Sequence, residues 1–334
     1  MSAVEISISN MKILNFRLML LRSVLAALLL LSVSHQSRAE TSPATTDWVD
    51  KGNAATKAGD FKGAVEAFTK ALELDPKNSP AYASRAYARI QLEEYRSAVE
   101  DCHKAVEIDP NNATAFLNRG AAYARLGNPK RAVADYDTAI KLDPKSARAY
   151  GDRGLARLET NDFQGAVEDN DKAIALDPTN ARFYVNRGYG YAGTGDNKGT
   201  IEDCSKAVSL APKMIAAHIC LGMGHYNLAD FKNAVVDFTK AIELDPKSIM
   251  AYSNRGAAFY NLDDFKKSVE DNTKAIELNP KFARAYFWRG TAKKKLGDKD
   301  AAVADIKMAA SLGDPDANKQ INPKKSENHK GHSH

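Results

Sequence analysis

The sequence has 334 residues, 44% of them apolar and 27% charged, which is typical of a soluble protein with a hydrophobic core. The net charge is +5, and residues 1–39 carry +3 of it, which leaves +2 for the rest of the chain. So small an excess gives no reason to expect nucleic acid or an anionic membrane as a partner. Three cysteines are too few for a disulfide framework, so packing is expected to stabilise the fold.

Residues 1–39 are typical of an export signal. Basic residues precede a mostly apolar run at 24–33, and small residues then mark a cleavage site after Ala39. We predict a cleaved signal peptide, a short arm at 40–44, and a periplasmic or secreted protein that is not inserted in a membrane after cleavage. The alternative is an uncleaved anchor at 19–33, a segment that is short for a hydrocarbon layer about 30 Å thick.

From residue 45 onward the chain repeats itself every 34 residues. The repeat is visible in a series of prolines: Pro76, Pro110, Pro144, Pro178, Pro212, Pro246 and Pro280. Aligned on these prolines, the chain divides into eight units: 45–78, 79–112, 113–146, 147–180, 181–214, 215–248, 249–282 and 283–316. The last unit is slightly out of step, because Asp314 stands at the proline position. A repeat of this length is typical of stacked helix pairs.

Each unit is expected to contain two helices. In the third unit, side chains suited to a buried face recur at helical spacing in two stretches: Phe116, Gly120 and Tyr123, then Ala132, Tyr136 and Ala139. Gly127 and Pro129 break the chain between the two stretches. The residue before a proline is disfavoured in a helix, so the second helix is expected to end before Pro144. Neither helix could bury its apolar face alone, and we therefore predict an all-α solenoid of antiparallel pairs.

Small residues at two positions favour close packing of the two helices. We number a position by its place in the unit, counted from the first residue of that unit. Glycine stands at place 8 in seven units: Gly52, Gly120, Gly154, Gly188, Gly222, Gly256 and Gly290. Alanine stands at place 20 in six units: Ala64, Ala98, Ala132, Ala166, Ala234 and Ala302. Bulkier side chains at these places would wedge the pair apart.

Together these patterns resemble the tetratricopeptide repeat. The resemblance covers residues 45–316, and the first unit carries the whole pattern as Trp48, Gly52, Ala64, Phe68, Ala71 and Pro76. It implies a right-handed superhelix whose concave groove is lined mainly by the first helices. The fifth unit departs from the pattern with Thr200 at place 20 and a glycine-rich turn at 193–199, and the sixth has His218 at the aromatic place 4. We predict that any hinge of the solenoid lies at residues 192–200.

Arginine and aspartate also recur in step with the repeat. Place 7 holds Arg85, Arg119, Arg153, Arg187, Arg255 and Arg289, and place 23 holds Asp101, Asp135, Asp169, Asp203, Asp237, Asp271 and Asp305. The first unit lacks both, and the sixth has Leu221 at place 7. One interpretation is a cationic strip for an anionic ligand. We favour the other, in which each Arg pairs with an Asp of its own or the preceding unit, because recognition residues would not recur so uniformly with an acid.

The resemblance implies that ligand contacts come from places 2, 5, 6, 9, 12 and 13 of the first helices. One subfamily binds a C-terminal carboxylate through Lys and Asn at set places. Here places 5 and 9 of the second and third units are Ala83, Tyr87, Leu117 and Ala121, so membership of that subfamily is disfavoured. We predict that partner contacts lie among the variable groove residues Tyr87, Asn118, Arg148, Arg182, Asn186, Tyr189, Ile219, Met223, Met250, Asn254, Tyr260, Arg284, Phe287, Trp288 and Lys294. In the last unit, Phe287 and Trp288 beside the basic run 293–295 suit an acidic segment or a neighbouring chain, or mark the end of the stack.

No motif for catalysis, cofactor binding or metal binding occurs, so we predict a protein that is not an enzyme and needs no cofactor or metal. Residues 317–334 are expected to be a disordered, polar Lys/His-rich tail, whose histidines offer the alternative of weak metal binding. Cys204 and Cys220 lie in adjacent units, and a disulfide between them is left open.

We interpret the chain as a non-catalytic scaffold of the bacterial cell envelope that binds another protein or an extended peptide in its groove. One alternative is an assembly subunit that self-associates through its last unit. Another is a glycan-related role, which would need a partner enzyme.

Overall fold

The computed structural model describes residues 42–321, and every regular element in this range is a helix. The first helices of the eight units are α2 (Pro43–Ala58), α4 (Ser79–Gln91), α6 (Ala113–Arg125), α8 (Ala147–Glu159), α10 (Ala181–Thr194), α12 (Ile215–Asn227), α14 (Ile249–Asn261) and α16 (Ala283–Lys295). The second helices are α3 (Phe61–Leu74), α5 (Tyr95–Ile108), α7 (Pro129–Leu142), α9 (Phe163–Leu176), α11 (Asn197–Leu210), α13 (Phe231–Leu244), α15 (Phe265–Leu278) and α17 (Lys299–Ser311), after which comes α18 (Pro315–Ile321). The expected signal peptide and the chain beyond residue 321 lie outside the described residues.

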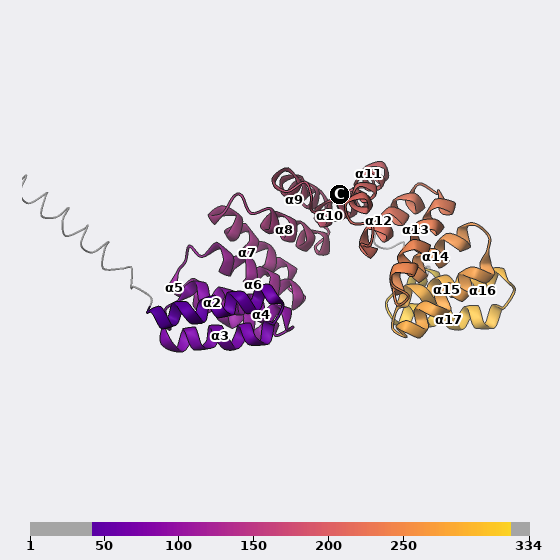
Figure 1. Ribbon diagram of the computed structural model, residues 1–334. Helices are drawn as coiled ribbons and strands as arrows, with labels where there is room; N and C mark the ends of the chain where they lie inside the picture. Colours follow the sequence, from indigo (N-terminus) through magenta and orange to yellow (C-terminus); the bar gives the residue numbers. More distant parts are fainter. Residues whose placement is uncertain (1–41, 322–334) are drawn as a thin grey trace, which may run out of the picture.

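The helices form an arch of stacked pairs (Figure 1). The two helices of each unit pack on each other, and each second helix also packs on the first helix of the next unit. First helices of neighbouring units contact one another as well, whereas no comparable contact joins neighbouring second helices within residues 42–321. The first helices therefore line the concave side. The chain is the predicted all-α solenoid, with eight antiparallel helix pairs wound into a right-handed superhelix. None of the described helices combines the length and the apolarity needed to cross a membrane.

The close approach predicted at the small residues is confirmed. A methyl group added to Gly52 would lie 2.6 Å from the ring of Phe68, and one added to Gly120 would lie 2.7 Å from the ring of Tyr136. Ala64, at place 20 of the first unit, is fully buried. Because protein interiors are close-packed, a larger side chain at these places would have to push the two helices apart.

Two units have a buried asparagine at place 24, where the first and third units have an aromatic ring. Asn170 and Asn272 are both fully buried. Asn272 donates to the carbonyl of Ser268 and accepts from the hydroxyl of Ser253. Asn170 donates to the carbonyl of Ala166, but its Oδ1 has no partner among the described residues. An unpaired buried acceptor costs about 1–3 kcal/mol, so the fourth unit carries a local weakness.

The turn that was expected to be loose has the same short form as the others. Only two residues separate α10 from α11, and one of them, Gly195, takes the positive φ (86°) that the turn needs. Gly193 lies inside α10, where its missing side chain leaves room for the ring of Phe163, and Gly199 lies in the first turn of α11. The expectation of a loose turn was therefore wrong, because these glycines serve packing and one tight turn, and a hinge at 192–200 stays a prediction.

His218 takes over the contact that an aromatic residue makes at place 4. Its Nε2–H donates to the carbonyl of Pro212 at 2.9 Å. The hydroxyl of Tyr184 donates to the carbonyl of Pro178 in the same way, at 3.1 Å. The substitution therefore keeps the hydrogen bond that ties the start of the first helix to the preceding turn.

A disulfide joins the fifth and sixth units. Cys204 of α11 and Cys220 of α12 are fully buried and bonded to each other, with their Cα atoms 5.8 Å apart. Gly188 leaves room for the bond, since a methyl group on it would lie 2.6 Å from Sγ of Cys204 and 2.9 Å from Sγ of Cys220. Cys102 is buried and free. One covalent cross-link therefore adds to the packing that the sequence predicted.

The tail does not begin at residue 317. The carboxylate of Asp314 accepts from the N–H groups of Asp316 and Ala317 and so caps α18. Ala317 is fully buried against the last unit, and Arg284 of α16 pairs with Asp316 at 2.7 Å. The predicted tail is therefore wrong for residues 317–321, because the acid at the proline position starts a further helix.

Candidate functional site

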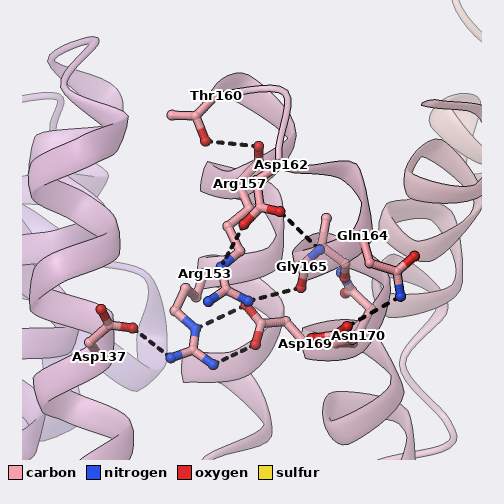
Figure 2. A network of polar contacts seen from close by, with 11 residues as sticks. Asp137, Arg153, Arg157, Thr160, Asp162, Gln164, Gly165, Asp169 and Asn170 are labelled. Atoms are coloured by element: carbon pink, nitrogen blue, oxygen red, sulfur yellow. Dashed lines mark hydrogen bonds and ion pairs between the residues drawn. The ribbon is translucent and has the colours of Figure 1, made fainter. Parts of the chain in front are cut away.

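The six arginines at place 7 are bound inside the stack and are not available as a cationic strip. Each one donates from Nε and Nη2 to the two oxygens of the Asp at place 23 of its own unit, as Arg153 does with Asp169 (Figure 2). The distances across the six pairs are 2.5–2.9 Å. Nη1 of Arg153 also reaches Asp137, at place 25 of the preceding unit, at 2.6 Å. The predicted internal pairing is confirmed, and it ties adjacent units together.

Burial and ion pairing have opposite effects on the pKa values of these aspartates. Burial raises the pKa of Asp203 and Asp271 above the ordinary value, although hydrogen bonds from their arginines oppose the shift. Burial also acts on Asp305, but there the hydrogen bonds from Arg289 and Lys293 outweigh it and lower the pKa. Each of these carboxylates is paired with a cation of its own unit. The Arg–Asp pairs, which we call the arginine ladder, therefore stabilise the stack, and we do not place the site there.

The sixth unit lacks the arginine, and its acid is paired with a histidine. Leu221 stands at place 7, and Asp237 instead contacts Nδ1 of His225 at 2.7 Å. His225 stands at place 11, where Arg89 and Arg157 supply a second cation to the acids of their own units. Burial raises the pKa of Asp237, and the hydrogen bond from His225 opposes the rise. No group of three or more His, Cys, Asp or Glu side chains placed to hold a metal ion occurs within the described residues.

The concave side contains a polar hollow near its N-terminal end, which we call the Tyr87 hollow. It measures about 260 Å³ and is lined by Asn53, Thr56, Ser84, Tyr87, Thr114, Asn118 and Arg148, from helices α2, α4, α6 and α8. Arg148 lies over the ring of Tyr87, 5.6 Å from its centroid, and half of the Arg148 side chain is exposed. It also pairs with Asp152 at 3.3 Å. Three of the predicted contact residues, Tyr87, Asn118 and Arg148, thus come together here.

Asn118, which lines this hollow, has a buried acceptor without a partner. The residue is 1% exposed, and its Nδ2 donates at 2.9 Å to the carbonyl of Ala83 in the neighbouring first helix. Its Oδ1 has no partner within residues 42–321. The oxygen is itself buried, so it costs the folded protein about 1–3 kcal/mol and is not presented to a ligand. The hydroxyl, amide and guanidinium groups of the other lining residues suit a ligand with a polar main chain.

A second, more apolar hollow follows along the groove, and we call it the Tyr189 hollow. It measures about 480 Å³ and is lined by Leu158, Glu159, Phe163, Tyr189, Ala192, Gly193, Met223 and Asn227. The hydroxyl of Tyr189 donates to the carbonyl of Ala216 at 3.4 Å, and burial raises the pKa of Tyr189 to about 12. Tyr189 and Met223, both predicted, form part of its wall. Its chemistry suits an apolar side chain beside one carboxylate.

The aromatic residues of the last two units pack against one another. The ring of Trp288 lies 5.5 Å from that of Tyr260 and 5.4 Å from that of Phe287. Arg284 lies over both Phe287 and Trp288, at 5.0 and 5.2 Å from the ring centroids, and pairs with Asp316 of α18. These four predicted residues therefore hold the end of the stack together, and the cation of Arg284 is already paired.

The remaining predicted contact residues lie elsewhere. Ile219 is a correction, because it is 6% exposed and belongs to the core between neighbouring first helices. Asn186 is also buried and donates to the carbonyl of Gly151 at 3.3 Å, which joins two first helices. Four residues line neither hollow: Arg182, Met250, Asn254 and Lys294.

The sequence analysis missed several residues that line the hollows: Asn53, Thr56, Ser84 and Thr114 in the first, and Leu158, Glu159, Phe163 and Asn227 in the second. All of them except Phe163 stand at the places that the family uses for ligand contacts. Their position alone could have identified them. They were overlooked because small polar residues and leucine looked less distinctive than Tyr, Met and Arg.

Family models match most of the repeat region. Models described as tetratricopeptide repeat match residues 48–78, 67–100, 117–181, 216–248, 249–282 and 272–304, and a model described as TPR repeat matches residues 86–127. A comparison with curated protein sequences gives no significant match.

Among solved structures, the chain is similar to the crystal structure of the APC/C hetero-tetramer Cut9-Hcn1, with 17% identity and a TM-score of 0.64 over 76% of this chain and 50% of that one. The chain thus spans half the length of that protein, and the likeness shows the fold. It is also similar to MamA, with 28% identity and a TM-score of 0.44 over 48% and 95% of the two chains. A third similar structure is YrrB, a TPR protein with an unusual peptide-binding site, with 24% identity and a TM-score of 0.43 over 56% and 96%. With its eight stacked helix pairs and the family models that match them, this chain belongs to the tetratricopeptide repeat family.

Proposed function

We propose that this protein is a non-catalytic scaffold that binds an extended segment of another protein along the concave side of its repeat stack. The observation that carries the proposal is the pair of hollows on the first-helix face. One is lined mainly by polar side chains, such as Thr56 and Asn118, and the other is more apolar and holds Tyr189 and Met223. A peptide offers both main-chain N–H groups and apolar side chains, and so matches the two in turn.

The two hollows follow one another along the same groove. Helix α8 contributes Arg148 to the Tyr87 hollow and Leu158 and Glu159 to the Tyr189 hollow. An extended chain could therefore occupy both without leaving the concave side. A preformed groove costs little reorganisation on binding, which favours affinity over the same contacts made by a mobile surface.

We include export to the bacterial cell envelope in the proposal. The pattern at residues 1–39 is that of a signal peptide, and the buried Cys204–Cys220 disulfide supports it, because disulfides persist in oxidising compartments and are rare in the cytosol. Fractionation of cells that express the full chain tests this part. We expect a periplasmic or secreted protein whose first residue is Glu40, and an uncleaved cytosolic chain would contradict it.

Capture from a cell-envelope extract tests the groove itself. The full chain should retain a partner that is lost, or retained at least tenfold less, with Tyr87→Ala and with Tyr189→Ala. Val236→Ala is the control, because Val236 lies on second helix α13, outside both hollows, and is 64% exposed. Circular dichroism should show the same helix content for all variants. A partner captured equally by all of them would place the binding surface outside the groove.

A further inference from the structure

The last helix within residues 42–321, α18, is about half as long there as the complete first helices. The eight complete first helices have 13–16 residues, whereas α18 has seven. Asp314 caps α18 two residues earlier in the repeat than the residues that precede α4 to α16, at the place where Ser42 caps α2, so Ala317 occupies the third position of this helix. Ala317 is fully buried, and the alanines at place 3 of six other units are buried too: Ala81, Ala115, Ala149, Ala217, Ala251 and Ala285. α18 is thus the beginning of a ninth first helix.

In the complete joints, the second half of a first helix covers the preceding second helix. A small residue at place 10 makes this contact and is buried in seven units: Ala88, Ala122, Ala156, Gly190, Gly224, Ala258 and Ala292. A methyl group added to Gly190 would lie 2.8 Å from Val167, and one added to Gly224 would lie 2.8 Å from Ile201. Val167 and Ile201 both stand at place 21, so place 21 of a second helix is the receiving surface.

At the end of the stack this receiving surface is open. Place 21 holds Val or Ile in all eight units, and among these residues only Val303 of α17 is exposed, at 53%. Beside it lies a hollow of about 440 Å³, whose apolar lining comes from Ala302, Val303, Ile306 and Ile321. The described part of α18 ends at Ile321, and no described residue covers α17 where the later turns of a complete first helix would lie.

The rim of this hollow, which we call the terminal hollow, is positive. Lys294, Lys299 and Lys307 line it, no acidic residue does, and none of the three lysines forms an ion pair within residues 42–321. An apolar floor with an unpaired positive rim is complementary to a helix that has small and apolar residues on one face and acids beside them.

Two occupants from this chain fit less well. The sequence after Ile321 contains Lys324, Lys325 and Lys330 against one glutamate, and no large apolar side chain, so it would add positive charge to a positive rim. A second copy that stacked its α2 on α17 would bring Lys51, at place 7, to Lys307, at place 25. In six of the seven complete joints, these two places hold an arginine and a residue that accepts its hydrogen bond or ion pair, as in Arg187 with Asp171.

We propose that the terminal hollow docks an acidic amphipathic helix of another protein, which completes the ninth first helix in trans. This surface is separate from the concave groove and does not depend on it. It would let the scaffold hold two partners, one along the groove and one at the end of the stack.

A matched pair of synthetic helices tests the proposal on the full chain. Both peptides have about 14 residues, or four turns, with the same Ala and Leu face, and they differ only in flanking Glu or flanking Lys. We expect the Glu peptide to bind with a dissociation constant that rises at least tenfold with Val303→Glu and also rises with salt. Val236→Glu is the control, because it places the same charge on an exposed valine of another second helix. Tyr87→Ala and Tyr189→Ala should leave this binding unchanged.

Three results would overturn the proposal. The Lys peptide could bind as tightly as the Glu peptide, which would remove the charge argument. The Glu peptide could fail to bind the full chain, or bind Val303→Glu equally well, which would show that the hollow is filled by the chain itself or is not the docking site. Light scattering could find a dimer of the full chain that Val303→Glu converts to a monomer, which would make a second copy the occupant.

Discussion

Loss of the Cys204–Cys220 disulfide should weaken the joint between the fifth and sixth units. The bond closes a loop over a sequence separation of 16 residues. A cross-link over a loop of this length restricts the unfolded chain and stabilises the folded one by about 3 kcal/mol in the chain-entropy model. After reduction, both thiols would stay buried beside Gly188, where water gives them no compensating solvation. We therefore expect reduction, or the double change Cys204→Ala and Cys220→Ala, to lower the free energy of unfolding by about 3 kcal/mol.

Guanidinium unfolding followed by circular dichroism, with and without a reductant, measures this loss. A solenoid is stabilised unit by unit, so hydrogen exchange should speed up mainly in α11 and α12. Cys102→Ala is the control, because Cys102 is the free buried thiol and its removal should leave the effect of the reductant unchanged. The reductant should have no effect on the double variant.

A thiol count gives the decisive result. Burial raises the pKa of Cys102 well above its ordinary value, so the folded protein should not react with a thiol reagent at neutral pH. Unfolded without a reductant, the chain should expose one reactive thiol. Three reactive thiols under these conditions, or a reduced chain as stable as the oxidised one, would refute the reasoning.

Four further substitutions test the turns and the packing of the units by the same unfolding assay. Ala229 has a positive φ of 60°, so Ala229→Gly should stabilise the protein by about 0.5–1 kcal/mol, whereas Ala54→Gly in the exposed middle of α2 should cost a similar amount. Gly120→Val should cost about 1–3 kcal/mol, because the added group would run into the ring of Tyr136; a stability equal to the parent would show that the helices can separate freely. Asn170→Leu should raise stability by about 1–2 kcal/mol by removing the unpaired Oδ1, and a loss would mean that this oxygen has a partner in solution.

The architecture of the stack was predictable because eight units pack a pair of helices in the same way. Every unit must end its second helix at one place and bring two helices close at another, and six units also pair a buried arginine, so the same residue types recur at a fixed spacing. The arginine at place 7 and the aspartate at place 23 could be recognised as partners for this reason, and they are partners in all six units that carry both. When one residue type recurs at the same place of several units, its role can be inferred from all of these units together.

Features that occur once were harder to predict. Gly193 was expected to loosen a turn, but it admits the ring of Phe163, a contact between units that no local pattern reveals. Ile219 was assigned to the groove by its place, yet that place is buried wherever neighbouring first helices come close together, as at Val185 and Ser253. Asp314 was taken as a lapse in the proline series, but it is the cap of α18. In each case the outcome depends on a neighbour in space that the spacing along the chain does not specify.

The one gap in the arginine ladder coincides with the one covalent bond between units. Six joints are bridged by an arginine whose Nη1 reaches place 25 of the preceding unit, but at the joint between units five and six, place 7 is Leu221 and place 25 is Ser205. The disulfide between Cys204 and Cys220 crosses this same joint. These contacts are hydrogen bonds to a threonine or a histidine, or ion pairs with a half-exposed aspartate, and each contributes about 1 kcal/mol, whereas the cross-link contributes about 3 kcal/mol. At this joint, a disulfide therefore stands in place of the arginine contact. The disulfide is stronger but persists only in an oxidising compartment, and after reduction the joint has neither contact.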